Sequence, residues 1–392
     1  MTTSMTPPPT GHFAPLLDPT HRPLHAREVA RFVQAALPRF DDGRRVTFVG
    51  LHDRDLPEAL WQGVSAVPGV TLLAYDLREG DPSDHLRQIL SAPDAGHFSF
   101  HSFCETQGRP ASRFAKNFAK SLSKSSSREH GCPEASADYT SYEFPRRDLV
   151  AWQAETVLAG HFAGDPAAQR QSADRFFSLL SEHGDGGDYT VEVLSGPADE
   201  RRRLIVSGKR PWMELCGPAV VGDIRFAPGC ELFWNGVEVD GDFHCTGALN
   251  LLPLGNEFDD APYRRLLELG ARLPGEGVDL RLKEGRLVAV DSPGTLAAAF
   301  SEVFARDEAY STVVEVGIGL SPAALPLITS WASPTNEAVS GVHVGFGADP
   351  ADIDRFTTRI HLDFVAPDVT VLVNGQVFYT NGEFTPAPAP AA

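Results

Sequence analysis

The first part of the chain alternates between two hydrophobic periods. From His25 to Leu37 apolar residues recur every three or four positions, which predicts a helix with one buried face. Residues 56–67 and 85–90 show the same period, whereas VTFVG at 46–50 and VTLLAY at 70–75 are short apolar runs typical of buried strands. Strands that alternate with helices indicate a parallel sheet covered on both faces. The sequence therefore predicts a small α/β domain in this region.

Residues 108–185 have a mostly helical pattern. In one segment both basic and apolar residues recur at intervals of three or four, so a helix there would carry a basic stripe beside an apolar one. The basic positions are Arg113, Lys116, Lys120 and Lys124. A patch that binds an acidic ligand is one interpretation, and a surface helix with one buried face is the other. We favour the surface helix.

From residue 188 the pattern changes to short strands. Residues 277–292 and 369–382 read as hairpins that turn at Glu284-Gly285 and Asn374-Gly375, where glycine accepts the positive φ of a tight turn. We therefore expect an N-terminal α/β domain with a helical extension over residues 23–185, followed by an α+β, mainly antiparallel domain over 186–384. The proline-rich segments 1–22 and 385–392 lack a hydrophobic period and are expected to be disordered tails.

Composition narrows the class of protein. Apolar residues make up 42% and charged residues 22% of the chain, as in soluble globular proteins. Since no apolar run approaches the ~20 residues of a membrane span and the first residues lack a secretory pattern, we expect neither a membrane segment nor a signal. Five cysteines without paired spacing favour reduced thiols in the cytoplasm. The formal charge of −18 disfavours nucleic-acid binding, which needs a surplus of Lys and Arg.

Carboxylates and imidazoles lie within apolar, strand-like segments of the second half. The candidates are Glu231 in FAPGCELFW, Glu315 in VVEVGIG, His343 in GVHVGFG, and His361 and Asp363 in RIHLDFV. Because side chains alternate along a strand, His361 and Asp363 would project to the same face. An ionised carboxylate buried without a partner costs several kcal/mol, so these groups need each other or a metal. Three carboxylates and two imidazoles suit one or two divalent ions such as Zn, Mn, Co or Fe.

Four of these segments together resemble the aminopeptidase T family of two-domain metalloproteins and its 2,5-dihydroxypyridine 5,6-dioxygenase-like relatives. The matching segments are PGCELF, EVGIGLSP, GVHVGFG and IHLDFV, in the order of the family, over about half of the chain. The resemblance implies an aminopeptidase T-like second domain. It also implies that Glu231, Glu315, His343, His361 and Asp363 bind two metal ions that activate a water for hydrolysis of an N-terminal peptide bond. In the dioxygenase-like relatives, one iron(II) would be bound by Glu315, His361 and Asp363. Relatives further imply a homodimer.

The chain also departs from the family pattern. Pro350 stands where the peptidases have a tyrosine, and Asn336-Glu337-Ala338 stands where relatives have D-E-K, so the lysine is lost. Glu257, in PLGNEFDDAP, is a rival for the position assigned to Glu231, because its context also resembles a P-x-G-E segment. We prefer Glu231 because an apolar strand follows it.

Three hypotheses about function follow. The first is a metal-dependent, aminopeptidase-like hydrolase that acts on the N-terminus of a peptide and uses Zn, Co or Mn. The second is a catalytically silent peptide-binding protein of this fold, for instance in peptide natural-product biosynthesis, which the departures at Pro350, Ala338 and Cys230 motivate. The third is an Fe(II)-dependent ring-cleaving dioxygenase with a small-molecule substrate. Catalytic residues beyond the metal ligands are not indicated by the sequence.

Overall fold

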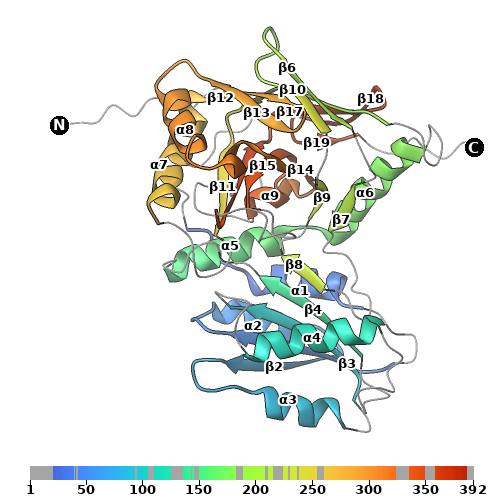
Figure 1. Ribbon diagram of the computed structural model, residues 1–392. Coiled ribbons are helices and arrows are strands. Elements are labelled where there is room, and N and C mark those ends of the chain that lie inside the picture. Colours follow the sequence, from blue (N-terminus) through green and yellow to red (C-terminus); the bar gives the residue numbers. More distant parts are fainter. Residues whose placement is uncertain are drawn as a thin grey trace, which may run out of the picture. The chain divides into compact units, whose positions relative to one another are not determined.

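The computed structural model describes residues 21–38, 40, 43–92, 95–104, 110–124, 136–142, 144, 150–181, 189–207, 211–214, 224–227, 230–235, 238–253, 260–323, 335–348 and 358–385 (Figure 1). The predicted tails therefore fall almost entirely outside the described residues. Contacts divide the chain into an N-terminal unit, His21–Arg170 with Glu214–Cys230, and a C-terminal unit, Gln171–Met213 with Glu231–Ala392. The domain boundary near residue 185 remains a prediction.

The N-terminal unit contains the predicted parallel sheet. Its five strands have the order β2-β1-β3-β4-β8, and all pairings between them are parallel. The strands are β1 (Val46–His52), β2 (Val70–Asp76), β3 (His97–Phe103), β4 (Ser136–Tyr142) and β8 (Ile224–Ala227). The sequence patterns did not reveal that β8, far along the chain, joins this sheet.

Helices cover both faces of the parallel sheet. They are α1 (Ala26–Ala36), α2 (Glu58–Ser65), α3 (Ser83–Leu90), α4 (Pro110–Lys124) and α5 (Ala151–Ala163), and α6 (Pro166–Ser181) follows. One face is apolar, because Val49, Phe98 and Phe100 pack with the alanines of α4. Arg113 and Lys120 are exposed on α4 while Ala115 is buried, which agrees with a surface helix that has one buried face.

The other face of the parallel sheet carries a buried polar network. His97 Nε2 lies 2.7 Å from Asp138 Oδ2, and the Ser99 hydroxyl donates to Asp138 Oδ1 over 2.8 Å. Arg225 on β8 lies 3.2 Å from the same carboxylate. The His101 ring is 3.1 Å from the Tyr142 hydroxyl. All the groups that face Asp138 thus come from strands of this sheet.

An eight-stranded antiparallel sheet forms one layer of the C-terminal unit. Its order is β13-β12-β10-β6-β5-β17-β18-β19. The strands are β5 (Val191–Ser195), β6 (Arg202–Ser207), β10 (Glu238–Cys245), β12 (Val278–Lys283), β13 (Arg286–Asp291), β17 (Val369–Val373), β18 (Gln376–Thr380) and β19 (Glu383–Phe384). Both predicted hairpins are present, and Gly285 and Gly375 have φ of 71° and 79° at their turns.

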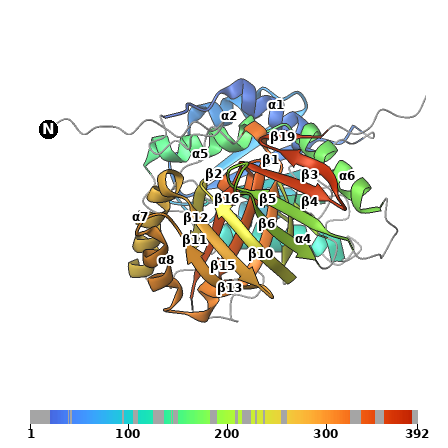
Figure 2. The ribbon, with the colours of Figure 1, turned by 90° about the horizontal axis from the view of Figure 1, so that it is seen from above.

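A six-stranded sheet, which we call the inner sheet, forms the second layer, with the order β11-β16-β15-β14-β9-β7. Its strands are β7 (Trp212–Glu214), β9 (Glu231–Asn235), β11 (Ala248–Pro253), β14 (Val313–Gly319), β15 (Gly341–Gly347) and β16 (Ile360–Ala366). The accompanying helices are α7 (Asp260–Glu276), α8 (Leu296–Phe304), the 3-10 turn η2 (Glu308–Ser311) and the short α9 (Thr335–Ala338). Helices α7 and α8 lie side by side in both views (Figures 1 and 2).

The inner sheet has one apolar face and one polar face. On the apolar face, Phe300 of α8 meets Phe364 with ring centroids 5.2 Å apart, and helix α7 packs on β11. This packing makes the inner sheet a rigid support for the polar side chains on its opposite face. The chain as a whole is a mixed α/β protein with one parallel and two antiparallel sheets. No helix in the described parts is long and apolar enough to cross a membrane.

Candidate metal centre

The polar face of the inner sheet gathers all five candidate residues from neighbouring strands. Glu231 lies on β9, Glu315 on β14, His343 on β15, and His361 and Asp363 on β16. In the strand register Asp363 is opposite Gly345, which in turn is opposite Glu315. Since residues two apart on a strand share a face, His343 projects beside Gly345 and His361 beside Asp363. The register therefore brings these side chains to one region of the sheet.

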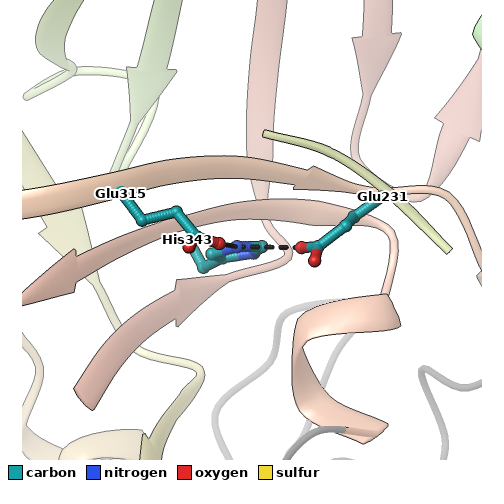
Figure 3. A group of neighbouring side chains, drawn as sticks. All are labelled: Glu231, Glu315 and His343. Carbon is teal, nitrogen blue, oxygen red and sulfur yellow. Dashed lines mark hydrogen bonds and ion pairs between the residues drawn. The ribbon is translucent and has the colours of Figure 1, made fainter. Parts of the chain in front are cut away.

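His343 lies between two glutamates (Figure 3). Its Nε2 atom is 3.1 Å from Glu231 Oε2 and 3.3 Å from Glu315 Oε1. The three side chains are buried, with exposures of 1% for His343, 7% for Glu231 and 9% for Glu315. Their possible ligand atoms all lie within 4.8 Å of one another. This spacing is close enough for a single cation to contact all three.

A second group of three combines helix α9 with β16, the strand next to β15. It consists of Glu337 on α9 with His361 and Asp363, and its possible ligand atoms are also within 4.8 Å of one another. His361 Nε2 is 3.1 Å from Asp363 Oδ1, so the two side chains share a face as the sequence predicted. His361 Nδ1 is 2.8 Å from the carbonyl oxygen of Ala348 and donates to it. That hydrogen bond directs Nε2 toward the carboxylates.

Two glycines make room for these side chains. A Cβ atom on Gly317 would lie 2.0 Å from His343 Nε2, and one on Gly345 would lie 2.6 Å from Asp363 Oδ1 and 3.0 Å from Glu315 Cβ. No larger residue fits at either position without moving the histidine or the carboxylates. The glycines in VVEVGIG and GVHVGFG are thus part of the site, because their missing side chains leave the space that it occupies.

Negative charge exceeds positive charge in this region. The two groups together hold four carboxylates, those of Glu231, Glu315, Glu337 and Asp363, but only two imidazoles. Among the described residues, none of these carboxylates forms an ion pair with lysine or arginine; their ion pairs are with His343 and His361. Buried carboxylates without enough counter-charge are costly, so the region is suited to bind cations.

The pKa values in the metal-free site reflect this surplus. Burial acts to lower the pKa of His343, but its contacts with Glu231 and Glu315 outweigh burial and raise it well above the ordinary value. The pKa of His361 is raised to about 9, because the negative charge of Asp363, 3.1 Å away, outweighs burial. Burial and the charge of Asp363 raise the pKa of Glu337. In the absence of a cation, protons therefore supply the counter-charge.

The donor set fits a divalent metal ion. Carboxylate oxygens and imidazole nitrogens are common ligands of Zn, Mn, Co and Fe. Asp363 Oδ1 is buried and makes no hydrogen bond with the residues that the structure describes, which leaves it available as a ligand. If both imidazoles are neutral, two divalent ions would balance the negative charge of the four carboxylates. One divalent ion would leave part of that negative charge uncompensated.

Sequence reasoning missed two residues of this region. Glu337 belongs to the Asn336-Glu337-Ala338 segment, where attention fell on the lost lysine rather than on the glutamate. Asn250 on β11 donates hydrogen bonds to both Glu337 and Asp363 and carried no signal in the sequence. Glu257, the rival to Glu231, and Pro350 both lie outside the described residues. The assignment of the five ligands to a metal therefore stays a prediction that the geometry allows.

Comparison with known proteins supports the fold. No protein-family model matches the chain, and no curated protein matches it. Among solved structures, the chain is similar to 2,5-dihydroxypyridine dioxygenase from Pseudomonas putida KT2440, with a TM-score of 0.52, 12% sequence identity, and coverage of 93% of this chain and 99% of that chain. The chain thus shares the fold of one of the relatives that the sequence motifs indicated. The specific likeness to aminopeptidase T remains an expectation.

Proposed function

We propose that this chain is a metal-dependent hydrolase of the aminopeptidase kind. The observation that carries the proposal is the cluster of four carboxylates and two imidazoles on one sheet face, without a lysine or arginine paired to them among the described residues. Each group of three would hold one divalent cation. The first cation would be bound by Glu231, Glu315 and His343, and a second by Glu337, His361 and Asp363.

The residues of the chain would contribute in distinct ways. A divalent ion at this position would supply a Lewis acid able to polarise a carbonyl group and to lower the pKa of a water. The carboxylates would hold the cation, and the Ala348 carbonyl orients the His361 ring. If only one of the two groups holds a cation, a negative surplus remains, and this surplus would favour a substrate that carries an ammonium group near the bond to be cleaved. A peptide with a free N-terminus is such a substrate.

An Fe(II)-dependent ring-cleaving dioxygenase is the second candidate, and the shared fold with 2,5-dihydroxypyridine dioxygenase favours it. Its expected ligands would be Glu315, His361 and Asp363. Glu315 contacts His343, so this set would require the Glu315 side chain to turn toward β16. A catalytically silent peptide-binding protein of the same fold is a third candidate.

Elemental analysis and substrate assays separate these functions. The protein is purified without a metal-chelating tag and assayed with aminoacyl amides and tripeptides in Zn, Co and Mn, and with 2,5-dihydroxypyridine in Fe(II) and oxygen. We expect metal-dependent peptide hydrolysis. We also expect that a metal at 100 times its Kd stabilises the fold by about 2.7 kcal/mol for each site, and that His361→Ala removes the hydrolysis and the share of the stabilisation that comes from the second group.

A matched control uses a second histidine–aspartate pair in the same unit. His244 Nδ1 is 2.7 Å from Asp279 Oδ1, outside the proposed site, so His244→Ala should leave metal binding unchanged. Peptide binding at micromolar concentration without turnover, and insensitive to a chelator, would contradict the hydrolase. Wild-type protein that takes up no transition metal would exclude both enzymatic functions.

A further inference from the structure

Asn250 links the two carboxylates of the second group. It is fully buried on β11, directly opposite Asp363 in the antiparallel register of β11 and β16. Its side-chain nitrogen donates to Asp363 Oδ2 over 3.0 Å and also to Glu337 Oε1 on α9. One amide group therefore joins side chains from three separate elements: β11, β16 and α9.

The neighbouring carboxylates determine the orientation of this amide. If the amide were turned over, Asn250 Oδ1 would face two carboxylate oxygens, and the contact would be repulsive. The nitrogen must therefore face them, although the two amide orientations differ little in shape. Asn250 Oδ1 points away and has no hydrogen-bond partner. Aspartate and leucine have similar sizes but lack the two donors.

The bond to Asn250 leaves the opposite oxygen of Asp363 available. Its Oδ2 is occupied by Asn250, whereas Oδ1 lies 3.1 Å from His361 Nε2 and makes no hydrogen bond. Glu337 Oε1 is likewise occupied, which leaves its second oxygen. His361 Nε2 is directed toward the same place because Nδ1 binds the Ala348 carbonyl. Each of the three groups is thus held by a hydrogen bond, and each offers one ligand atom within 4.8 Å of those of the other two.

We infer that Asn250 is a positioning residue that holds Asp363 and Glu337 so that each presents one oxygen to a divalent cation. The inference rests on the proposed metal site and adds to it a residue that does not itself bind the metal. Hydrogen bonds to the far side of metal ligands orient them, and their loss weakens metal affinity by about 10- to 100-fold. Asn250 also lowers the repulsion between the two carboxylates, because its donors lie between them.

The test replaces Asn250 and measures metal binding directly. Co²⁺ is titrated into wild type, Asn250→Leu and Asn250→Ser, with calorimetry for affinity and the visible absorption spectrum for ligand geometry. We expect Asn250→Leu to weaken Co²⁺ binding by about 10- to 100-fold and to alter the spectrum. Asn250→Ser keeps one hydrogen-bond donor, so its Co²⁺ affinity should lie between those of wild type and Asn250→Leu. If the leucine variant does not fold, the comparison of Asn250→Ser with wild type is the test.

Leu251→Ala is the matched control. Leu251 is the next residue on β11, buried on the opposite face, so its loss weakens strand packing without touching the carboxylates. It should lower stability and leave the Co²⁺ spectrum unchanged. If wild type binds Co²⁺ and the Asn250 variants bind it with equal affinity and the same spectrum, Asn250 has no positioning role while the metal site stands. If wild type binds no metal, the metal site and the role of Asn250 are both rejected.

Discussion

Each unit of this chain buries a histidine–aspartate pair on a sheet face, yet the two pairs differ in their surroundings. In the parallel sheet, Asp138 is contacted by His97, by the Ser99 hydroxyl and by Arg225. In the inner sheet, Asp363 is contacted by His361 and Asn250, and its other neighbours include further carboxylates. Both carboxylate oxygens of Asp138 are contacted by hydrogen-bond donors, one of which is the Arg225 guanidinium. Asp363 Oδ1, in contrast, has no hydrogen bond with any described residue.

The protonation of the histidines follows the same difference. In the N-terminal unit, burial lowers the pKa of His101 and of His161 to about 3, so both stay neutral. In the C-terminal unit the nearby carboxylates outweigh burial and raise the pKa of His343 and His361. A buried polar network that is electrically balanced stabilises a fold by itself. A network with surplus negative charge gains from an added cation, and this supports the metal site proposed on the inner sheet.

The largest expected effect comes from a matched pair of substitutions in metal-free buffer. Asp138→Asn removes a buried carboxylate charge that His97, Ser99 and Arg225 contact, and we expect it to lower the free energy of unfolding by about 3–5 kcal/mol. Asp363→Asn removes one of several surplus carboxylates and should cost much less. Urea denaturation with EDTA measures both. Equal losses would show that Asp363 is as fully compensated as Asp138 and would remove the electrostatic argument for a cation.

A smaller effect concerns acid stability in the N-terminal unit. His161 is buried, its two ring nitrogens have no hydrogen-bond partner in the described part of the chain, and burial depresses its pKa to about 3. Between that value and the ordinary 6.5, the unfolded chain binds a proton that the folded chain excludes, so stability falls as the pH falls through this window. Well below pH 6.5 the slope is about 1.4 kcal/mol per pH unit for this histidine.

The test is the variant His161→Phe, whose ring suits the aromatic contacts with Phe32 and Tyr142. Denaturation curves between about pH 4.5 and 7 should show a pH dependence that is smaller by about one proton than in wild type. Stability at pH 7 should not decrease, because no hydrogen bond is lost. An unchanged slope would mean that His161 is protonated in the folded chain, and the contrast between the two units would then be weaker.

The smallest expected effect tests whether the parallel-sheet network is purely structural. Tyr142→Phe removes the hydroxyl 3.1 Å from His101 Nδ1, and we expect a loss of about 0.5–1.5 kcal/mol in the free energy of unfolding. Metal affinity should stay the same, since the network has its own counter-charge. A change in metal affinity would show that the polar face of the parallel sheet contributes to the metal site.

The sequence predicted much of the fold and part of the site. Hydrophobic periods correctly indicated the α/β character of the N-terminal region, and Glu284-Gly285 and Asn374-Gly375 correctly indicated two hairpins. The spacing of His361 and Asp363 was sufficient to place them on one face. That β8 joins the parallel sheet, and that His97 meets Asp138, could not be predicted, because neither depends on a nearby residue.

What the sequence determined by itself is local: which segments form strands, where tight turns occur, and which side chains on one strand share a face. These properties follow from φ and ψ preferences and from the two-residue period of a strand. Only the tertiary structure decided that Glu337 and Asn250 join His361 and Asp363. Asn250 and Asp363 are 113 residues apart in sequence, and the register of β11 against β16 is set by the packing of a whole sheet on α7 and α8. A register shift of one residue would turn Asn250 to the opposite face, so the geometry of the candidate metal centre depends on packing that no local pattern encodes.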